Sequence, residues 1–63
     1  MYARYVELRD KMGAKDADVA KATGINPVVF TDWKKSKSVP KVDKLIKIAD
    51  FFGISLDELV REP

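Results

Sequence analysis

The chain has 63 residues, with 12 basic and 10 acidic side chains and a net charge of +2. It contains no cysteine and no histidine, which excludes disulfides, thiolate or imidazole catalysis and the commonest zinc ligands. We therefore expect one small domain, residues 1–63, without metal, cofactor, small-molecule substrate or deep catalytic cleft. No apolar run approaches the roughly 20 residues of a membrane span, so we expect a soluble, cytoplasmic protein. Because it also lacks a glycine-rich phosphate loop, we expect that it is not an enzyme.

The first two predicted helices have clear ends. The first covers about residues 2–12 and stops at Gly13, because glycine readily takes the left-handed conformation that closes a helix. The second covers about residues 16–23 and has two aspartates in its first turn, where the helix dipole favours negative charge. Gly24 ends this helix.

The third predicted helix has the best-defined start. Asn26 is a typical N-cap residue, and Pro27 suits the first helical position because its missing N–H is not needed there. The helix then carries Phe30 and Trp33 and ends in the lysine-rich segment 34–41. At helical spacing from Phe30, Trp33 is interpreted as a core residue. The alternative for this residue is a platform on which an unpaired base stacks.

The fourth predicted helix covers about residues 42–52 and ends at Gly53. A short fifth helix follows, because Ser55 with Glu58 three residues later is typical of a capped N-terminus. No strand-like alternation competes with these helices. The sequence therefore predicts an all-α fold in which the other helices pack around the second and third. The apolar stripe expected on the fourth helix consists of Leu45, Ile48, Ala49 and Phe52.

Residues 16–37, DADVAKATGINPVVFTDWKKSK, have the pattern of a helix-turn-helix with its turn at Gly24. From about Tyr5 to Val60 the chain resembles the DNA-binding domain of Cro and phage-repressor type helix-turn-helix proteins. This resemblance implies a compact five-helix, lambda-repressor-like domain whose third helix enters the major groove. It rests on the pairs Leu8-Arg9 and Val19-Ala20, on Gly24-Ile25-Asn26 and Trp33-Lys34, and on the tail from Lys44 to Leu59.

The resemblance also implies that the N-terminal part of the third helix reads base edges. Val28 can pack on a thymine methyl group, Thr31 can bond a base edge, and Asp32 can accept a hydrogen bond from a cytosine amino group. Each residue has an alternative: Asn26 only caps the helix, Val28 and Thr31 are merely exposed, and Asp32 pairs with a lysine such as Lys35. The candidate base-reading residues are Asn26, Pro27, Val28, Thr31 and Asp32.

The charge of the chain is unevenly distributed. Residues 34–47 hold six lysines and one aspartate, a balance of +5, so the remainder carries −3. Such a cluster can merely solubilise a small protein, but after a helix-turn-helix it lies where DNA phosphates pass. The candidate phosphate-binding residues are Arg9, Lys15, Lys35, Lys37, Ser38 and Lys41.

Three residues depart from the family's pattern. Where relatives often have glutamine, Pro27 offers only an apolar ring, and Asp16 cannot donate a hydrogen bond to phosphate. Lys34 stands where relatives often have a glutamate that pairs with the arginine matching Arg9. Because both residues are cationic here, Arg9 is expected to be free for phosphate or for a nearby acid such as Glu7 or Asp10.

Together these features predict sequence-specific binding to double-stranded DNA by a transcriptional regulator, a phage or prophage-type repressor that occupies an operator. A domain this small buries limited area on DNA, so we expect a homodimer on a two-fold symmetric operator. The alternative is a protein–protein interaction module, such as an antitoxin or a helix-turn-helix fold that binds a protein.

Overall fold

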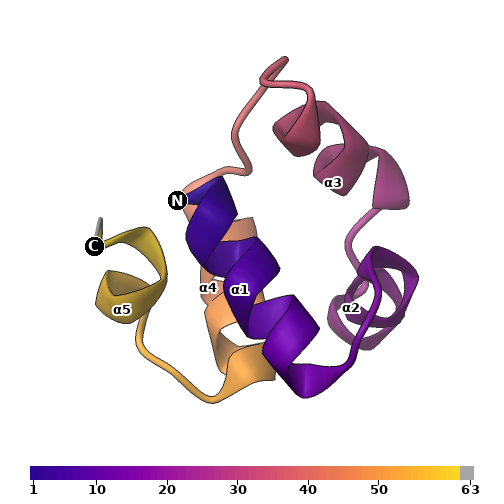
Figure 1. Cartoon of the computed structure of the whole chain (residues 1–63). Coiled ribbons are helices and arrows are strands. Elements are labelled where there is room, and N and C mark those ends of the chain that lie inside the picture. The colour runs from indigo at the N-terminus through magenta and orange to yellow at the C-terminus, as the bar shows by residue number, and fades with distance from the viewer. Residues whose placement is uncertain (62–63) are drawn as a thin grey trace.

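The computed structural model describes residues 1–61, which form five helices and, over that range, no strand. The predicted all-α, five-helix class is confirmed, and the helices lie where the sequence places them. Figure 1 shows the helices gathered around one centre. They are α1 (Tyr2–Met12), α2 (Asp16–Thr23), α3 (Pro27–Lys34), α4 (Val42–Phe52) and α5 (Leu56–Val60).

Side-chain caps determine where α3 and α5 begin. The Asn26 side chain accepts a 3.0 Å hydrogen bond from the backbone N–H of Val28. In the same way, Ser55 Oγ accepts a 3.1 Å bond from the N–H of Glu58. Each cap satisfies a backbone donor that has no partner within its helix. The start of α3 is thus fixed by local chemistry.

The turn between α2 and α3 depends on Gly24. This residue has φ +75°, a conformation that L side chains rarely adopt, and its N–H donates to the carbonyl of Ala20 at 2.9 Å. Ile25 follows and is 5% exposed, so it anchors the turn in the core. The short turn therefore holds α3 at a fixed angle to α2.

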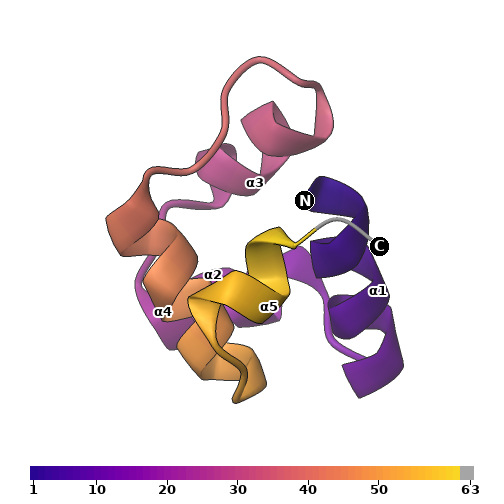
Figure 2. The ribbon, with the colours of Figure 1, turned by 90° about the vertical axis from the view of Figure 1, so that its left-hand side faces the viewer.

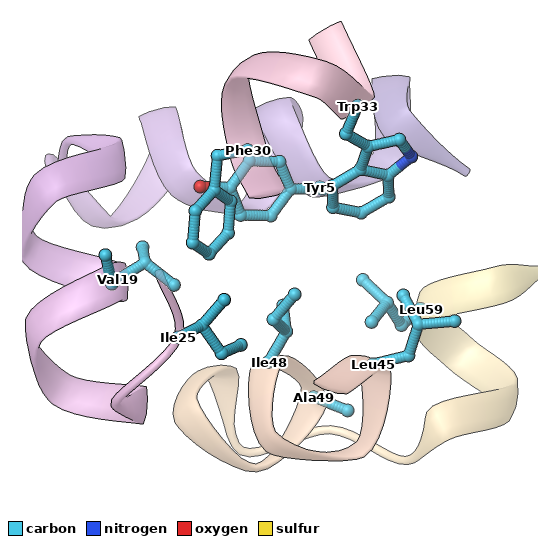
Figure 3. Packing of buried hydrophobic residues seen from close by; sticks show 10 residues of the cluster. Tyr5, Val19, Ile25, Phe30, Trp33, Leu45, Ile48, Ala49 and Leu59 are labelled. Atoms are coloured by element: carbon cyan, nitrogen blue, oxygen red, sulfur yellow. The ribbon is translucent and has the colours of Figure 1, made fainter. Parts of the chain in front are cut away.

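The core joins all five helices and the turn after α2. The ring of Tyr5 lies 5.5 Å from that of Phe30 and 5.0 Å from that of Trp33, in stacked arrangements (Figure 3). Trp33 is 4% exposed, which confirms its interpretation as a core residue. Aromatic pairs of this kind contribute about 0.5–1.5 kcal/mol beyond their burial. The buried hydrophobic residues of the core are Tyr5, Val19, Ala20, Ile25, Phe30, Trp33, Leu45, Ile48, Ala49 and Leu59.

The remaining contacts make α1, α4 and α5 a support for the helix-turn-helix. Helix α4 packs against both α2 and α5, and α1 packs against α5. In Figures 1 and 2, α3 and the segment between α3 and α4 lie together at one end of the molecule. Among residues 1–61, no helix has the length and apolar character needed to cross a membrane.

Candidate nucleic-acid interface

Helix α3 has one buried face and one exposed face. Phe30 is fully buried and Trp33 nearly so, whereas Val28 is 58% exposed and Thr31 and Lys35 are also exposed. Val28, Thr31 and Lys35 follow one another at spacings of three and four, so they lie on one side of the helix and its C-cap. This outer face presents an apolar group, a hydroxyl and a cation to solvent.

The other candidate base-reading residues lie at the edges of this face. Asn26 and Pro27 are exposed at the start of α3. The Asn26 oxygen is used by the cap, so its amide N–H groups are the part that can reach a base or phosphate. Asp32 is half-buried and is the least accessible of the five. The five residues thus lie along α3 from its N-cap to Asp32, on its exposed face or at the edges of that face.

The loop from α3 to α4 displays most of the candidate phosphate-binding residues. Its first part is tied to α3, because the Ser36 N–H donates to the Trp33 carbonyl at 3.1 Å and the Lys37 N–H to the Asp32 carbonyl at 2.8 Å. Ser36 has φ +58°, which reverses the chain here. Pro40 is buried and anchors the far end. The exposed side chains on this loop include Lys35, Lys37, Ser38 and Lys41.

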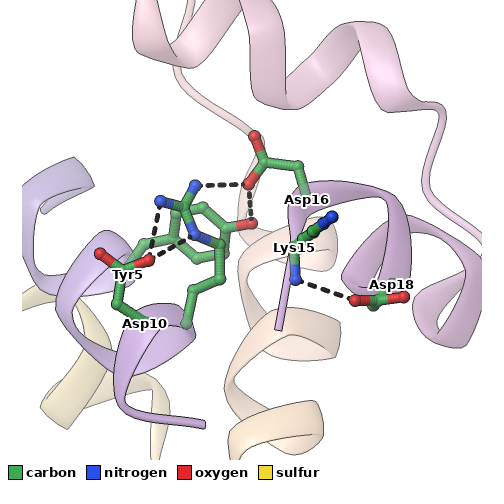
Figure 4. Close-up of polar contacts among 6 residues, drawn as sticks. Tyr5, Asp10, Lys15, Asp16 and Asp18 are labelled. Atoms are coloured by element: carbon green, nitrogen blue, oxygen red, sulfur yellow. Dashed lines mark hydrogen bonds and ion pairs between the residues drawn. The ribbon is translucent and has the colours of Figure 1, made fainter. Parts of the chain in front are cut away.

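A cluster of polar side chains joins α1 to the start of α2 (Figure 4). Asp16 Oδ1 accepts a 2.6 Å hydrogen bond from the Tyr5 hydroxyl and a 2.8 Å bond from the Arg9 guanidinium. Arg9 also binds Asp10 Oδ1 through two nitrogens, at 3.1 and 3.0 Å. Its guanidinium carbon lies 5.7 Å from the centre of the Tyr5 ring, within cation–π range. We call Tyr5, Arg9, Asp10 and Asp16 the α1–α2 cluster.

The cluster shifts the titration of its members. Burial, followed by the hydrogen bond to Asp16, raises the pKa of Tyr5 above its usual range. Burial alone would raise the pKa of Asp16 as well. The hydrogen bonds from Tyr5 and Arg9, with the positive charges of Arg9 and Lys34, outweigh burial and leave that pKa below its ordinary value. Tyr5 is therefore neutral and Asp16 ionised at neutral pH.

The α1–α2 cluster gives Arg9 two carboxylate partners. The sequence pointed to phosphate or to an acid such as Glu7 or Asp10, and the structure shows Asp10 together with Asp16. Asp16 was not foreseen as a partner. The signal that could have revealed it is the spacing of Tyr5 and Arg9, which places two donors on one face of α1 opposite the start of α2. Lys15, the other candidate outside the loop, is exposed just before α2.

Comparisons with known proteins identify the family. A family model described as helix-turn-helix, of the Cro and C1 type, matches residues 7–59. The chain belongs to this helix-turn-helix family, as the resemblance in its sequence implied. The family is one of DNA-binding transcription regulators and not of enzymes. No curated protein and no solved structure matches the chain.

Proposed function

We propose that residues 1–63 act as one domain that binds a specific double-stranded DNA sequence, as a cytoplasmic phage or prophage-type repressor occupying an operator. The observation that carries this proposal is the exposed face of α3 formed by Val28, Thr31 and Lys35, which continues into the exposed lysines of the α3–α4 loop. A groove-reading face beside a row of cations is the arrangement that base and phosphate contacts require.

In this proposal the two parts of the surface have different tasks. Val28 contacts a thymine methyl group and Thr31 a base edge, with Asn26, Pro27 and Asp32 bordering them. Lys35, Lys37, Ser38 and Lys41 bind phosphates, which positions α3 but carries no sequence information. Repression follows from occupancy of the operator.

Two copies of the chain are proposed to bind a two-fold symmetric site. The described residues extend 24 × 22 × 20 Å, so one copy covers only a short stretch of duplex. Half-sites one helical turn apart, about 34 Å, would place two α3 helices in successive major grooves on one side of the DNA. The two copies together then bury enough area on the DNA to bind an operator with the usual affinity.

The test is a comparison of two α3 variants on two duplexes. A preferred sequence is first selected from a random DNA pool. Val28→Ala and Thr31→Ala are each expected to weaken binding to that duplex about fivefold, about 1 kcal/mol, and to leave binding to scrambled duplex nearly unchanged. Met12→Ala is the control, because Met12 is 51% exposed at the end of α1 and lies outside both α3 and the α3–α4 loop. It should change neither affinity.

One observation favours a protein partner as a second candidate function. Helix α3 exposes Pro27 and Val28 in its first turn. It carries no cation until Lys34, its last residue. An unchanged ratio of specific to scrambled affinity in both α3 variants would overturn the DNA-reading proposal and favour this one. Heparin retention separates the two further, because only phosphate binding predicts a steep dependence on salt.

A further inference from the structure

The start of α2 is the second place where a helix-turn-helix meets DNA. The first helix of the motif crosses the phosphate backbone. The N-terminus of a helix attracts phosphate through its free N–H groups and its dipole. In this chain the first turn of α2 instead holds Asp16 and Asp18, and Asp18 accepts a 2.9 Å hydrogen bond from the backbone N–H of Lys15. The molecule's own carboxylates thus occupy this helix end.

Asp16 is held firmly in this place. Its carboxylate accepts hydrogen bonds from Tyr5 and Arg9, both on α1. Its side chain nevertheless remains 37% exposed, so the charge is open to solvent and to any anion that approaches α2. The carboxylate is therefore fixed in position, and an approaching phosphate can come close to it.

Arg9 does not offset this charge toward an approaching phosphate. Its guanidinium is shared between two carboxylates, those of Asp10 and Asp16, and its side chain is only 20% exposed. Lys15 and Asp18 also belong to this corner, and the charge of Lys34 acts on Asp16 as well, so the corner has three cations and three anions and no net positive charge. Lys34 is the first residue of the segment 34–47, whose balance is +5.

We propose that Asp16 limits the affinity of this domain for DNA: its fixed carboxylate repels phosphate from the start of α2 and keeps Arg9 within the α1–α2 cluster. Phosphate binding is thereby concentrated on the α3–α4 loop. This inference rests on the proposed DNA-binding function. Because phosphates carry no sequence information, Asp16 weakens binding to every duplex by the same factor.

The test is Asp16→Asn, which removes the charge and keeps an oxygen for Tyr5 and Arg9. The variant should bind both the selected and the scrambled duplex about fivefold more tightly, the factor expected for one unit charge near a phosphate in water. The ratio of the two affinities should stay the same. Affinities are measured at one salt concentration and at a temperature where circular dichroism shows each variant folded.

Two further variants separate charge from other effects. Asp57→Asn makes the same change in net charge on α5, away from α2 and α3 in Figure 1, and should leave affinity near that of the parent. Tyr5→Phe loosens Asp16 but keeps its charge, and should not tighten binding. An Asp16→Asn variant that binds like the parent, or an equal gain in either of the other variants, would overturn the inference. Failure of the parent to bind any duplex would instead overturn the proposed function.

Discussion

The Tyr5 hydroxyl on α1 donates a 2.6 Å hydrogen bond to Oδ1 of Asp16, the first residue of α2. The Tyr5 ring is at the same time fully buried against Phe30 and Trp33 of α3. One side chain therefore holds both helices of the helix-turn-helix against α1. Its removal or ionisation should affect the stability of the whole domain.

Stability is predicted to fall at alkaline pH because of Tyr5. The folded state raises the pKa of Tyr5, so its contribution is complete below the unfolded value of about 10 and is lost as pH rises toward the folded value. The loss should be about 1.4 kcal/mol per pH unit in that window. Urea unfolding of the parent and of Tyr5→Phe, from about pH 8 upward, measures it as a difference between the two proteins.

The difference in stability between the two proteins isolates Tyr5, because every other ionisable side chain is the same in both. Below about pH 10, Tyr5→Phe should be less stable than the parent by about 1.5–3 kcal/mol, the usual contribution of a hydrogen bond to a charged group. This difference in the free energy of unfolding should become smaller as pH rises above about 10. Tyr2→Phe, which removes a hydroxyl from a neighbouring position, is the control. A difference that stays constant with pH would contradict the assignment.

Trp33→Ala is predicted to lower the free energy of unfolding by roughly 3–5 kcal/mol, as deletion of a buried aromatic side chain does. Trp33 is 4% exposed and its ring lies 5.2 Å from that of Tyr2 and 5.0 Å from that of Tyr5. In so small a domain this loss leaves much of the protein unfolded. Thermal melting followed by circular dichroism measures it, with Trp33→Phe as a control that should lose less. Melting of the alanine variant at the parent's temperature would show that the ring does not support the core.

Lys37→Ala and Lys41→Ala are predicted to weaken binding to selected and scrambled duplexes alike. Each should also reduce the slope of log affinity against log salt by about 1, the value for one lost phosphate contact. Both lysines are exposed on the α3–α4 loop. Arg61→Ala removes one positive charge beyond α5 and should leave the slope unchanged. Equal slopes in all four proteins would remove the two lysines from the interface.

Ser36→Gly is predicted to stabilise the domain by about 0.5–1 kcal/mol. Ser36 has φ +58°, a left-handed conformation that costs a non-glycine residue energy and that glycine adopts freely. Ser38→Gly, on the same loop but with a negative φ, should be neutral or destabilising. Chemical denaturation of both variants tests this. A stabilisation of the same size at both positions would attribute the effect to the loop's composition instead.

The helices could be predicted from the sequence because their signals are local. Asn26 and Pro27 define the start of α3, and Gly24 defines the end of α2. Trp33 could be assigned to the core because its spacing from Phe30 follows the helix period. These features depend on residues within a few positions of one another, and the structure has them as expected.

The α1–α2 cluster could not be predicted in the same way, because it depends on how α1 and α2 approach each other. From the sequence, Asp16 suited a helix dipole and Arg9 was a cation without its family partner. In the folded protein Asp16 Oδ1 accepts hydrogen bonds from both Tyr5 and Arg9 of α1. The residues proposed to read bases differ from both. Their exposure could be predicted from the helix period, but their proposed partners, the bases, lie outside the chain.

Trp33 is the only tryptophan of the chain, and it points away from the outer face of α3 that carries Val28 and Thr31. Its fluorescence therefore comes from a single, water-excluded position beside two tyrosines. Unfolding exposes the indole and shifts its emission, whereas a duplex docked on the opposite face leaves the indole's surroundings intact. The protein thus carries its own optical reporter, one that separates loss of structure from occupancy by DNA without any added label.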